Sequence, residues 1–390
     1  MTQSVFFDNN STTLLDTMVL QAMLPYMQHQ YGNPTSRHCY GRAARQAIDT
    51  ARQQVAQACG AHPSQVIFTS GGTESNNLAL QGMAGDLEPA QQILVSAIEH
   101  PAVTRPAFAM RRLGHPVGVI ACDNHGKLLA DSLQANLERP TALVSMMMVN
   151  NETGVIQPIA ELARIARAHG ALVHTDAVQA LGKMPVQFDA LGVDAMTVSS
   201  HKIYGPQGVG ALILDKRVDI HPLLHGGGQE RGLRSGTENV AAIVGFGLAC
   251  ELMLQRWQSN QAHCAKLRER LEQGLVKLGA TIFGASAERV SNTSFFAFDD
   301  IEGETLVVAL DNAGFAVASG SACSSDSTEP SHVLMAMGVM PDLARGAVRV
   351  SLSADNTEQQ IDEFLTVLGQ QVMRLKSLTA VSIKPTEVTA

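Results

Sequence analysis

Lys202 and Asp176 are the side chains whose type and position most directly suggest chemistry, because each lies just after a short apolar run. A lysine among small residues at a strand end can lose its charge through burial, which frees the amine to bond a carbonyl carbon. An aspartate there is costly to bury unless it has a partner, and a protonated ring nitrogen would serve. Both positions also have ordinary interpretations: most lone lysines are solvated, and Asp176 could cap the next helix.

A glycine-rich turn follows another apolar run, at residues 66–68. Gly71 and Gly72 allow a tight turn, after which free amides and the hydroxyls of Thr73 and Ser75 would face outward at the start of a helix. This arrangement suits a phosphate group. It is also typical of an ordinary strand-to-helix turn with a hydroxyl cap.

Two further strand ends carry polar side chains, His100 and the pair Asn150 and Asn151. The histidine could stack on a flat ligand or move protons, or be structural; the asparagines could bind a hydroxyl or carboxylate, or form a turn. Together, a phosphate-binding turn, a flat ring, an aspartate and a lysine are what pyridoxal 5'-phosphate requires.

The elements that would position these residues alternate between short apolar runs and longer amphipathic segments. The runs lack strict alternation, as expected for strands covered on both faces, so the pattern predicts an α/β fold with a mostly parallel sheet between helices. Ligands bind beyond the carboxyl ends of such strands. The predicted strands are 66–68, 93–95, 142–149, 171–174 and 195–198, and the helices between them are 42–59, 103–113 and 159–169.

The pattern changes near residue 235, where a long helix from Thr237 to about Leu278 begins. Shorter strands and helices then indicate a smaller α+β domain: strands 293–298 and 347–352, helices 304–312 and 357–376. We expect an N-terminal segment, 1–15, packing with the small domain, a large cofactor-binding domain, 16–250, the small domain, 251–376, and a flexible tail, 377–390.

Composition excludes several classes of function. The 390 residues include 28 Lys and Arg against 36 Asp and Glu, a net charge of −8, with 45% hydrophobic and 16% charged residues. This balance argues against disorder and direct nucleic-acid binding. The apolar stretch Val240 to Cys250 is too short to cross a bilayer, and no secretory signal is visible, so we expect no membrane association. Six scattered cysteines indicate a reduced, cytoplasmic setting, and no spacing predicts a metal site.

Four longer motifs resemble those of the NifS/IscS cysteine desulfurases, which are class V, fold-type I pyridoxal-phosphate enzymes. The resemblance runs from Phe7 to about Leu375. It implies L-cysteine as substrate, a homodimer, and a sulfur-acceptor protein such as an iron–sulfur scaffold. The motifs are Ser70-Gly71-Gly72-Thr73-Glu74-Ser75-Asn76, Asn150-Asn151-Glu152-Thr153-Gly154, His174-Thr175-Asp176-Ala177-Val178-Gln179 and Ser199-Ser200-His201-Lys202-Ile203-Tyr204-Gly205-Pro206.

The resemblance also implies a role for each site residue. Lys202 would bond the cofactor aldehyde, Asp176 would hold the pyridine nitrogen, and His100 would stack on the ring and move protons. Cys323, in a segment of small polar residues, would take the sulfur from the substrate as a persulfide. Gln179 would contact the ring hydroxyl; Gly72, Thr73, Ser199, His201 and Thr237 of a second subunit would bind the phosphate; and Asn33, Asn151 and Arg349 would hold the substrate carboxylate.

Three positions depart from the family pattern. Ser11 stands where alanine is usual, which we expect to matter little; Asp326 replaces a frequent glycine beside the nucleophile, and Ala354 replaces an arginine. These changes predict altered rate or partner choice rather than another reaction. Alternatives are selenocysteine lyase or an aminotransferase on the same fold, or a catalytically weak scaffold, against which Lys202 and Asp176 count. The sequence leaves the acceptor open among iron–sulfur assembly, nitrogenase maturation, tRNA thiolation and DNA phosphorothioation.

Overall fold

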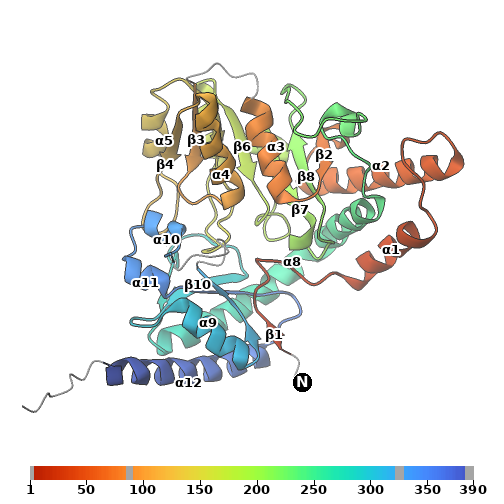
Figure 1. The fold of residues 1–390 in the computed structure, drawn as a ribbon. Coiled ribbons are helices and arrows are strands. Elements are labelled where there is room, and N and C mark those ends of the chain that lie inside the picture. Colours follow the sequence, from red (N-terminus) through yellow and green to blue (C-terminus); the bar gives the residue numbers. More distant parts are fainter. Residues whose placement is uncertain (1–3, 85–90, 321–328, 383–390) are drawn as a thin grey trace, which may run out of the picture.

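The computed structural model describes residues 4–84, 91–320 and 329–382 (Figure 1). A seven-stranded sheet forms its upper part in this view, with the strand order β2-β8-β7-β6-β5-β3-β4. Only β8 runs antiparallel to its neighbours. Neither β8 nor the edge strand β4 was among the predicted strands. The strands are β2 (Val66–Thr69), β3 (Gln92–Ser96), β4 (Val117–Ile120), β5 (Thr141–Ser145), β6 (Leu172–Asp176), β7 (Ala195–Ser199) and β8 (Gly210–Leu214).

Helices cover both faces of this sheet, which is why its central strands β5 and β7 are buried along their whole length. One face packs on α3 (Gly72–Ala84) and α4 (Pro101–Ala109) through one buried cluster. The other packs on α2 (Cys39–Cys59), α5 (Ala130–Asn136) and α6 (Ile159–Ala168) through a second. The α/β fold predicted from the sequence is therefore confirmed, and β3, β5, β6 and β7 end at one edge of the sheet.

A smaller antiparallel sheet lies next to that edge, in the order β12-β13-β10-β9. Its core contains aromatic side chains such as Phe296 from the sheet and Phe364 from the C-terminal helix. The elements are β9 (Thr281–Ile282), β10 (Thr293–Ala297), β12 (Ala318–Ser319), β13 (Val348–Ser351), α9 (Gly303–Asn312), α10 (His332–Ala336), α11 (Pro341–Arg345) and α12 (Glu358–Ser382).

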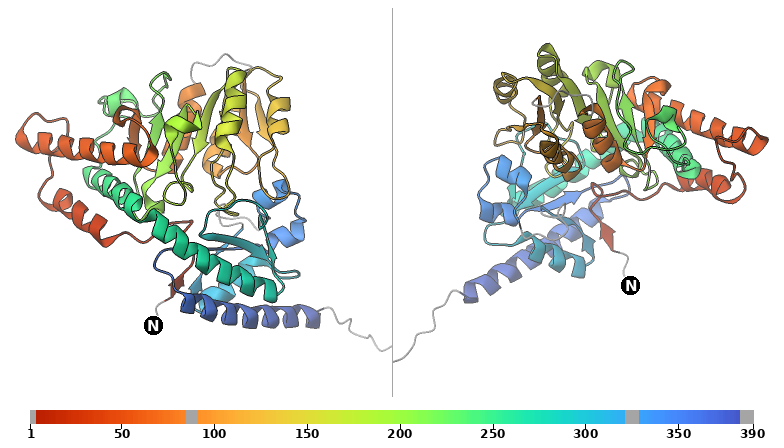
Figure 2. Two further views of the ribbon diagram at one scale, coloured as in Figure 1. Left: turned by 180° about the vertical axis from the view of Figure 1, so that it is seen from behind. Right: turned by 45° about the horizontal axis from the view of Figure 1, so that its top comes forward.

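The first residues of the chain run along the small sheet before they reach the large one (Figure 2). β1 (Val5–Phe6) pairs in parallel with β11 (Phe315–Ala316), and Asp8 bridges to Ser351 of β13. The chain then continues into α1 (Thr17–Gln28), which packs beside α8. Residues 8–11, called the N-terminal strap below, thus lie where the two sheets approach each other.

Helix α8 (Val240–Lys277) connects the two parts and matches the predicted long helix. Its first half contributes Phe246 and Cys250 to the large core, and its second half contributes Leu267 and Leu271 to the small core. It is the one helix in the described ranges with a window long and apolar enough for a membrane span, of mean hydropathy 1.3. Packing against α1 and α2 accounts for that apolar character.

The C-terminal helix is longer than the sequence pattern predicts. α12 extends to Ser382, whereas the tail was expected to start at residue 377. Residues 377–382 contain neither glycine nor proline, so nothing in the local sequence stops the helix at Lys376. The helix thus continues into the segment that the sequence analysis assigned to the tail.

Candidate active site

The sequence predicts a phosphate site at the turn between β2 and α3. Gly71, with a φ of 152°, leads into Gly72, the first residue of α3. A Cβ atom on Gly72 would lie 3.0 Å from a Val178 methyl carbon and 3.8 Å from Cβ of Ser199, so the helix start packs against the end of β7. The Ser199 hydroxyl is buried and has no hydrogen-bond partner among the described residues. Free amides of the first turn, the exposed Thr73 and this hydroxyl fit a phosphate group.

Two more side chains were predicted to contribute to the phosphate site, Ser75 and His201, and they differ in burial. Ser75 is fully buried, and its Oγ lies 2.7 Å from Oγ of Thr69; the expectation that it faces outward is wrong, because it falls on the inner side of the first helical turn. His201 is half-buried, with Nδ1 3.2 Å from Oγ1 of Thr12. Burial, and then the charge of Lys202, lower the pKa of His201 to about 4.

The Asp176 carboxylate is held at the end of β6 by two donors. Nδ2 of Asn76 donates to Oδ2 at 2.7 Å, and the backbone amide of Val178 donates to Oδ1 at 2.9 Å. No helix follows Asp176 directly, so the aspartate caps a turn and not a helix. Its carboxylate is fixed in position, and its contact with a ring nitrogen stays a prediction. Sequence reasoning missed the contribution of Asn76, a buried amide on the sheet-facing side of α3.

His100 begins α4 as its N-cap. Its Nδ1 accepts a hydrogen bond from the Ala102 amide at 3.0 Å, which places the proton of a neutral ring on Nε2. Burial lowers the pKa of His100; Asp176 opposes this shift and Lys202 adds to it. The neutral ring can donate from Nε2, and it can accept a proton on Nδ1 only after the contact with Ala102 breaks.

A short helix connects the small domain to this side of the site. Ser331, which caps α10, donates to the buried carboxylate of Glu152, and Nε2 of His332 lies 2.9 Å from the Glu99 carbonyl oxygen. Burial raises the pKa of Glu99 to about 8. Cys323, the predicted sulfur acceptor, and Asp326 precede this helix and lie outside the described residues.

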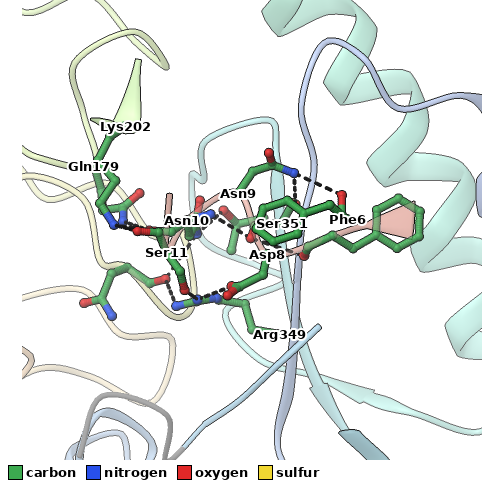
Figure 3. A network of polar contacts seen from close by, with 12 residues as sticks. Phe6, Asp8, Asn9, Asn10, Ser11, Gln179, Lys202, Arg349 and Ser351 are labelled. Carbon is green, nitrogen blue, oxygen red and sulfur yellow. Dashed lines mark hydrogen bonds and ion pairs between the residues drawn. The ribbon is translucent and has the colours of Figure 1, made fainter. Parts of the chain in front are cut away.

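Lys202 follows β7 and points at the N-terminal strap (Figure 3). Its amine donates to the carbonyl oxygens of Asn10 and Ser11, the latter at 2.6 Å. Nε2 of Gln179 donates to the same Asn10 oxygen at 2.8 Å. The two residues that the family resemblance places at the aldehyde and the ring hydroxyl of the cofactor therefore meet at one backbone group.

Arg349 reaches the site from β13 and is only 5% exposed. Its guanidinium donates to the Asn151 carbonyl at 2.9 Å, to Asp8 Oδ1 at 2.7 Å and to Ser11 Oγ at 2.9 Å. Nε is buried and has no partner in the part of the chain that the structure describes. An unpaired guanidinium N–H suits a carboxylate ligand. Ser11, which we expected to matter little, is thus in direct contact with this arginine.

The other departure from the family pattern that the structure describes lies beside the same strap. The Ala354 amide donates to the hydroxyl of Tyr204 at 3.1 Å. Position 354 therefore contributes a backbone donor.

Asn33 and Thr237 are not brought to the other predicted site residues. Asn33 lies exposed in the connection between α1 and α2, where its Oδ1 accepts from the amide and hydroxyl of Thr35. Figure 1 shows this connection at the outer end of α2. Thr237 is exposed in the turn before α8. Nothing in the local sequence of Asn33 distinguished it from a residue at the site itself.

Comparison with known proteins agrees with this arrangement. The aminotransferase class-V family model matches residues 5–364. The chain is 41% identical over 382 residues to the cysteine desulfurase IscS of Dictyoglomus turgidum, covering 97% of each protein. A solved NifS-like protein superposes with a TM-score of 0.90 at 39% identity, covering 95% of this chain and 100% of the other.

A solved structure of SspA in complex with cysteine superposes with a TM-score of 0.82 at 32% identity, covering 91% of this chain and 100% of the other. The predicted fold-type I architecture is therefore confirmed. The carboxylate of Asp176, the amine of Lys202 and the phosphate site at α3 fit pyridoxal phosphate, the cofactor of these enzymes. The chain belongs to the aminotransferase class-V family and, within it, to the cysteine desulfurases.

Proposed function

We propose that the chain removes sulfur from L-cysteine, releasing L-alanine and leaving a persulfide on Cys323 that passes to an acceptor protein. One observation carries the proposal: the fixed carboxylate of Asp176 and the amine of Lys202 follow the adjacent strands β6 and β7, and the buried guanidinium of Arg349 faces the same strap as Lys202. A cofactor ring and an amino-acid carboxylate need these three groups.

The cofactor would be held by residues already in place. Lys202 would bond its aldehyde, Asp176 its ring nitrogen and Gln179 its ring hydroxyl, while Gly72, Thr73, Ser199 and His201 would surround its phosphate. When bound, pyridoxal phosphate supplies an electron sink that weakens the bonds at the substrate Cα and Cβ. Lys202 then takes the Cα proton, and Arg349 with Asn151 orients the substrate carboxylate.

Sulfur transfer needs a thiolate and a proton acceptor. The thiolate of Cys323 attacks the substrate sulfur; a sulfur–sulfur bond forms, the Cβ–sulfur bond breaks, and its electron pair remains on carbon. Protons then restore the methyl group and Cα–H of alanine. A free thiol has a pKa near 8.5, so a base is required near neutral pH. The neutral ring of His100 serves once Nδ1 leaves the Ala102 amide.

Cys323→Ser tests the reaction, with Cys39→Ser as the control because Cys39 is an exposed free thiol. We expect Cys323→Ser to lose persulfide formation and to slow alanine release at least about 100-fold, while Cys39→Ser keeps both. The measurements are alanine release from cysteine and persulfide mass on the isolated protein. Full alanine release by Cys323→Ser would contradict the proposal and favour a lyase that works without a cysteine; a keto acid product would favour an aminotransferase.

We also infer a homodimer that associates through α1 and the connection to α2. Met27 and Tyr31 are 64% and 76% exposed there, and Tyr31 stacks on Tyr40 with ring centres 5.7 Å apart. Exposed aromatic and methionine side chains are enriched in protein interfaces. Asn33 lies in the same connection, so its predicted contact with a substrate, like that of Thr237 with phosphate, would be made in the site of a second copy.

Light scattering tests the dimer. We expect Tyr31→Asp to shift the protein toward monomer, whereas Met373→Asp, at a 68% exposed position on α12, leaves the mass unchanged. A monomeric unmodified protein at micromolar concentration contradicts the inference.

The cellular setting and the acceptor follow from the same proposal. The five described cysteines are all free thiols, which fits a cytoplasmic location. We propose that the acceptor is a protein, and that iron–sulfur assembly is its pathway. Transfer of labelled sulfur from persulfidated protein to a purified scaffold tests this, and retention of all label on Cys323 contradicts it.

A further inference from the structure

Asn10 uses every hydrogen-bonding group that it has, although only 2% of it is exposed. Its amide donates to Oγ of Ser351 at 2.9 Å. Its side-chain Nδ2 donates to the Asn151 carbonyl at 3.1 Å and to Thr293 Oγ1 at 2.9 Å. Its Oδ1 accepts from Lys183 Nζ at 2.6 Å and from Asn292 Nδ2 at 3.1 Å. Asn10 therefore joins the ends of the large sheet to strands β10 and β13 of the small one.

The contacts with Gln179 and Lys183 form a closed ring of hydrogen bonds. The Asn10 carbonyl accepts from Gln179 Nε2, the Gln179 Oε1 accepts from Lys183, and Lys183 donates back to Asn10 Oδ1. A side-chain amide whose oxygen and nitrogen are both engaged has one orientation only. The ring thus fixes which end of the Gln179 amide faces the site.

The amine of Lys202 depends on the same residue, because the Asn10 carbonyl is one of its acceptors. The position of that carbonyl is set by the four side-chain contacts of Asn10, which run to both sheets. Figure 3 shows Lys202 and Gln179 converging on this group from one side and Arg349 contacting the strap from another. A displacement of about 1 Å at a reacting group can cost roughly 100-fold in rate.

We propose that Asn10 is a positioning residue, which holds the Lys202 amine and the Gln179 amide in register with the small domain through its paired backbone and side-chain contacts. The inference deepens the proposed function and rests on it, since it assigns a role to Asn10 only if Lys202 bonds the cofactor.

Asn9 provides a matched control. It is 4% exposed, lies next in the chain, and its Nδ2 donates to the carbonyls of Phe6 and Ser351, at 3.3 and 2.9 Å. Its Nδ2 has two acceptors, as Nδ2 of Asn10 does, but Asn9 has no hydrogen bond with Lys202, Gln179 or Lys183 among the described residues. Loss of its side chain should therefore weaken the fold without moving the Lys202 amine.

The experiment measures how fast Lys202 captures added pyridoxal phosphate in cofactor-free full-length protein. Capture joins the amine nitrogen to the aldehyde carbon and releases water; borohydride then fixes the product, and peptide mapping locates it. We expect Asn10→Ala to capture the cofactor roughly tenfold more slowly than the unmodified protein. Asn9→Ala should stay within about twofold while losing a similar amount of thermal stability.

Thr293→Val gives a second, milder variant should Asn10→Ala fail to fold. It removes one acceptor of the Asn10 side chain and keeps the shape of residue 293, so we expect capture to slow by roughly two- to threefold. Its control is Ser294→Ala, because the Ser294 hydroxyl is buried with no partner among the described residues.

The possible outcomes separate the two proposals. No label on Lys202 in the unmodified protein overturns the proposed function itself. Normal labelling there, with Asn10→Ala equal to Asn9→Ala, or with Thr293→Val equal to Ser294→Ala should Asn10→Ala not fold, overturns the positioning role alone.

Discussion

The ends of the large sheet and the N-terminal strap serve the same site but are built in different ways. At the strand ends, Asp176 and His100 accept hydrogen bonds from backbone amides two residues further along the chain. At the strap, Asp8 pairs with Arg349 and Asn10 bonds Ser351, each across 341 residues. Groups of the first kind are held in part by local turns, although Asn76 also holds Asp176 from α3, whereas groups of the second kind exist only when two sheets have docked. We therefore expect changes at the strand ends to affect chemistry and changes at the strap to affect geometry and binding.

The largest expected effect lies at the strand ends. Lys202→Ala removes both the amine that bonds the cofactor and the base for the Cα proton, so alanine release should fall at least about 1,000-fold. Lys216→Ala, at an exposed position after β8, is the control and should keep full activity. Substantial turnover by Lys202→Ala would mean that the chemistry does not depend on the end of β7, and the comparison would fail.

A smaller effect, on binding, is expected where the strap meets β13. Arg349→Lys removes the bidentate fork, so the KM for cysteine should rise about tenfold with less change in kcat. Arg289→Lys is a matched control, because Arg289 is also buried and ion-paired, with Glu272 at 2.8 Å, in the small domain. If both variants lose stability equally and neither alters KM, Arg349 is only structural.

His174, within strand β6, tests the comparison through the free energy of unfolding, not through the reaction rate. Burial lowers the pKa of His174 to about 3, and its ring lies between Ser145 and Thr197. In the unfolded chain, His174 takes up a proton as the pH falls through about 6.5, whereas in the folded protein it stays neutral. The stability that His174 contributes is therefore fully present above about pH 6.5 and is lost as the pH falls. The loss approaches about 1.4 kcal/mol per pH unit.

His174→Gln should therefore lower the pH dependence of the unfolding free energy by about one proton between roughly pH 6.5 and 4. Denaturant titrations across that range provide the measurement. His125→Gln, at an exposed loop position, should leave the slope unchanged. An unaltered slope in His174→Gln would show that the buried ring is protonated in the folded protein.

The smallest expected effect concerns Ser11. Ser11→Ala removes one of the three acceptors of the Arg349 guanidinium described above and keeps the Asp8 carboxylate, so KM should rise by less than about threefold. Asp8→Asn, which weakens the charged partner instead, should raise KM more. The opposite order would show that the hydroxyl, not the ion pair, orients the arginine.

Features set by local sequence were predicted well, and features set by long-range packing were not. The mostly parallel sheet and the long helix after residue 237 were predicted from local sequence patterns, and the structure confirms both. Strands β4 and β8 and the extension of α12 to Ser382 were missed, because a short apolar run and a helix without a stop signal give weak sequence signals. Ser75 is buried where we expected it to face outward, and the role of Asn76 was not predicted. Which side of the first helical turn is buried depends on what packs against the helix.

The sequence by itself determined which reactive groups this protein has and that one sheet edge would carry them, since turn-forming residues and strand ends are encoded within a few positions. Only the tertiary structure decided that the carbonyl of Asn10 lies between Lys202 and Gln179, and that Asp8 and Ser11 contact Arg349. Hydrogen bonds between segments hundreds of residues apart require both sheets to be folded and docked, and no local periodicity records that event.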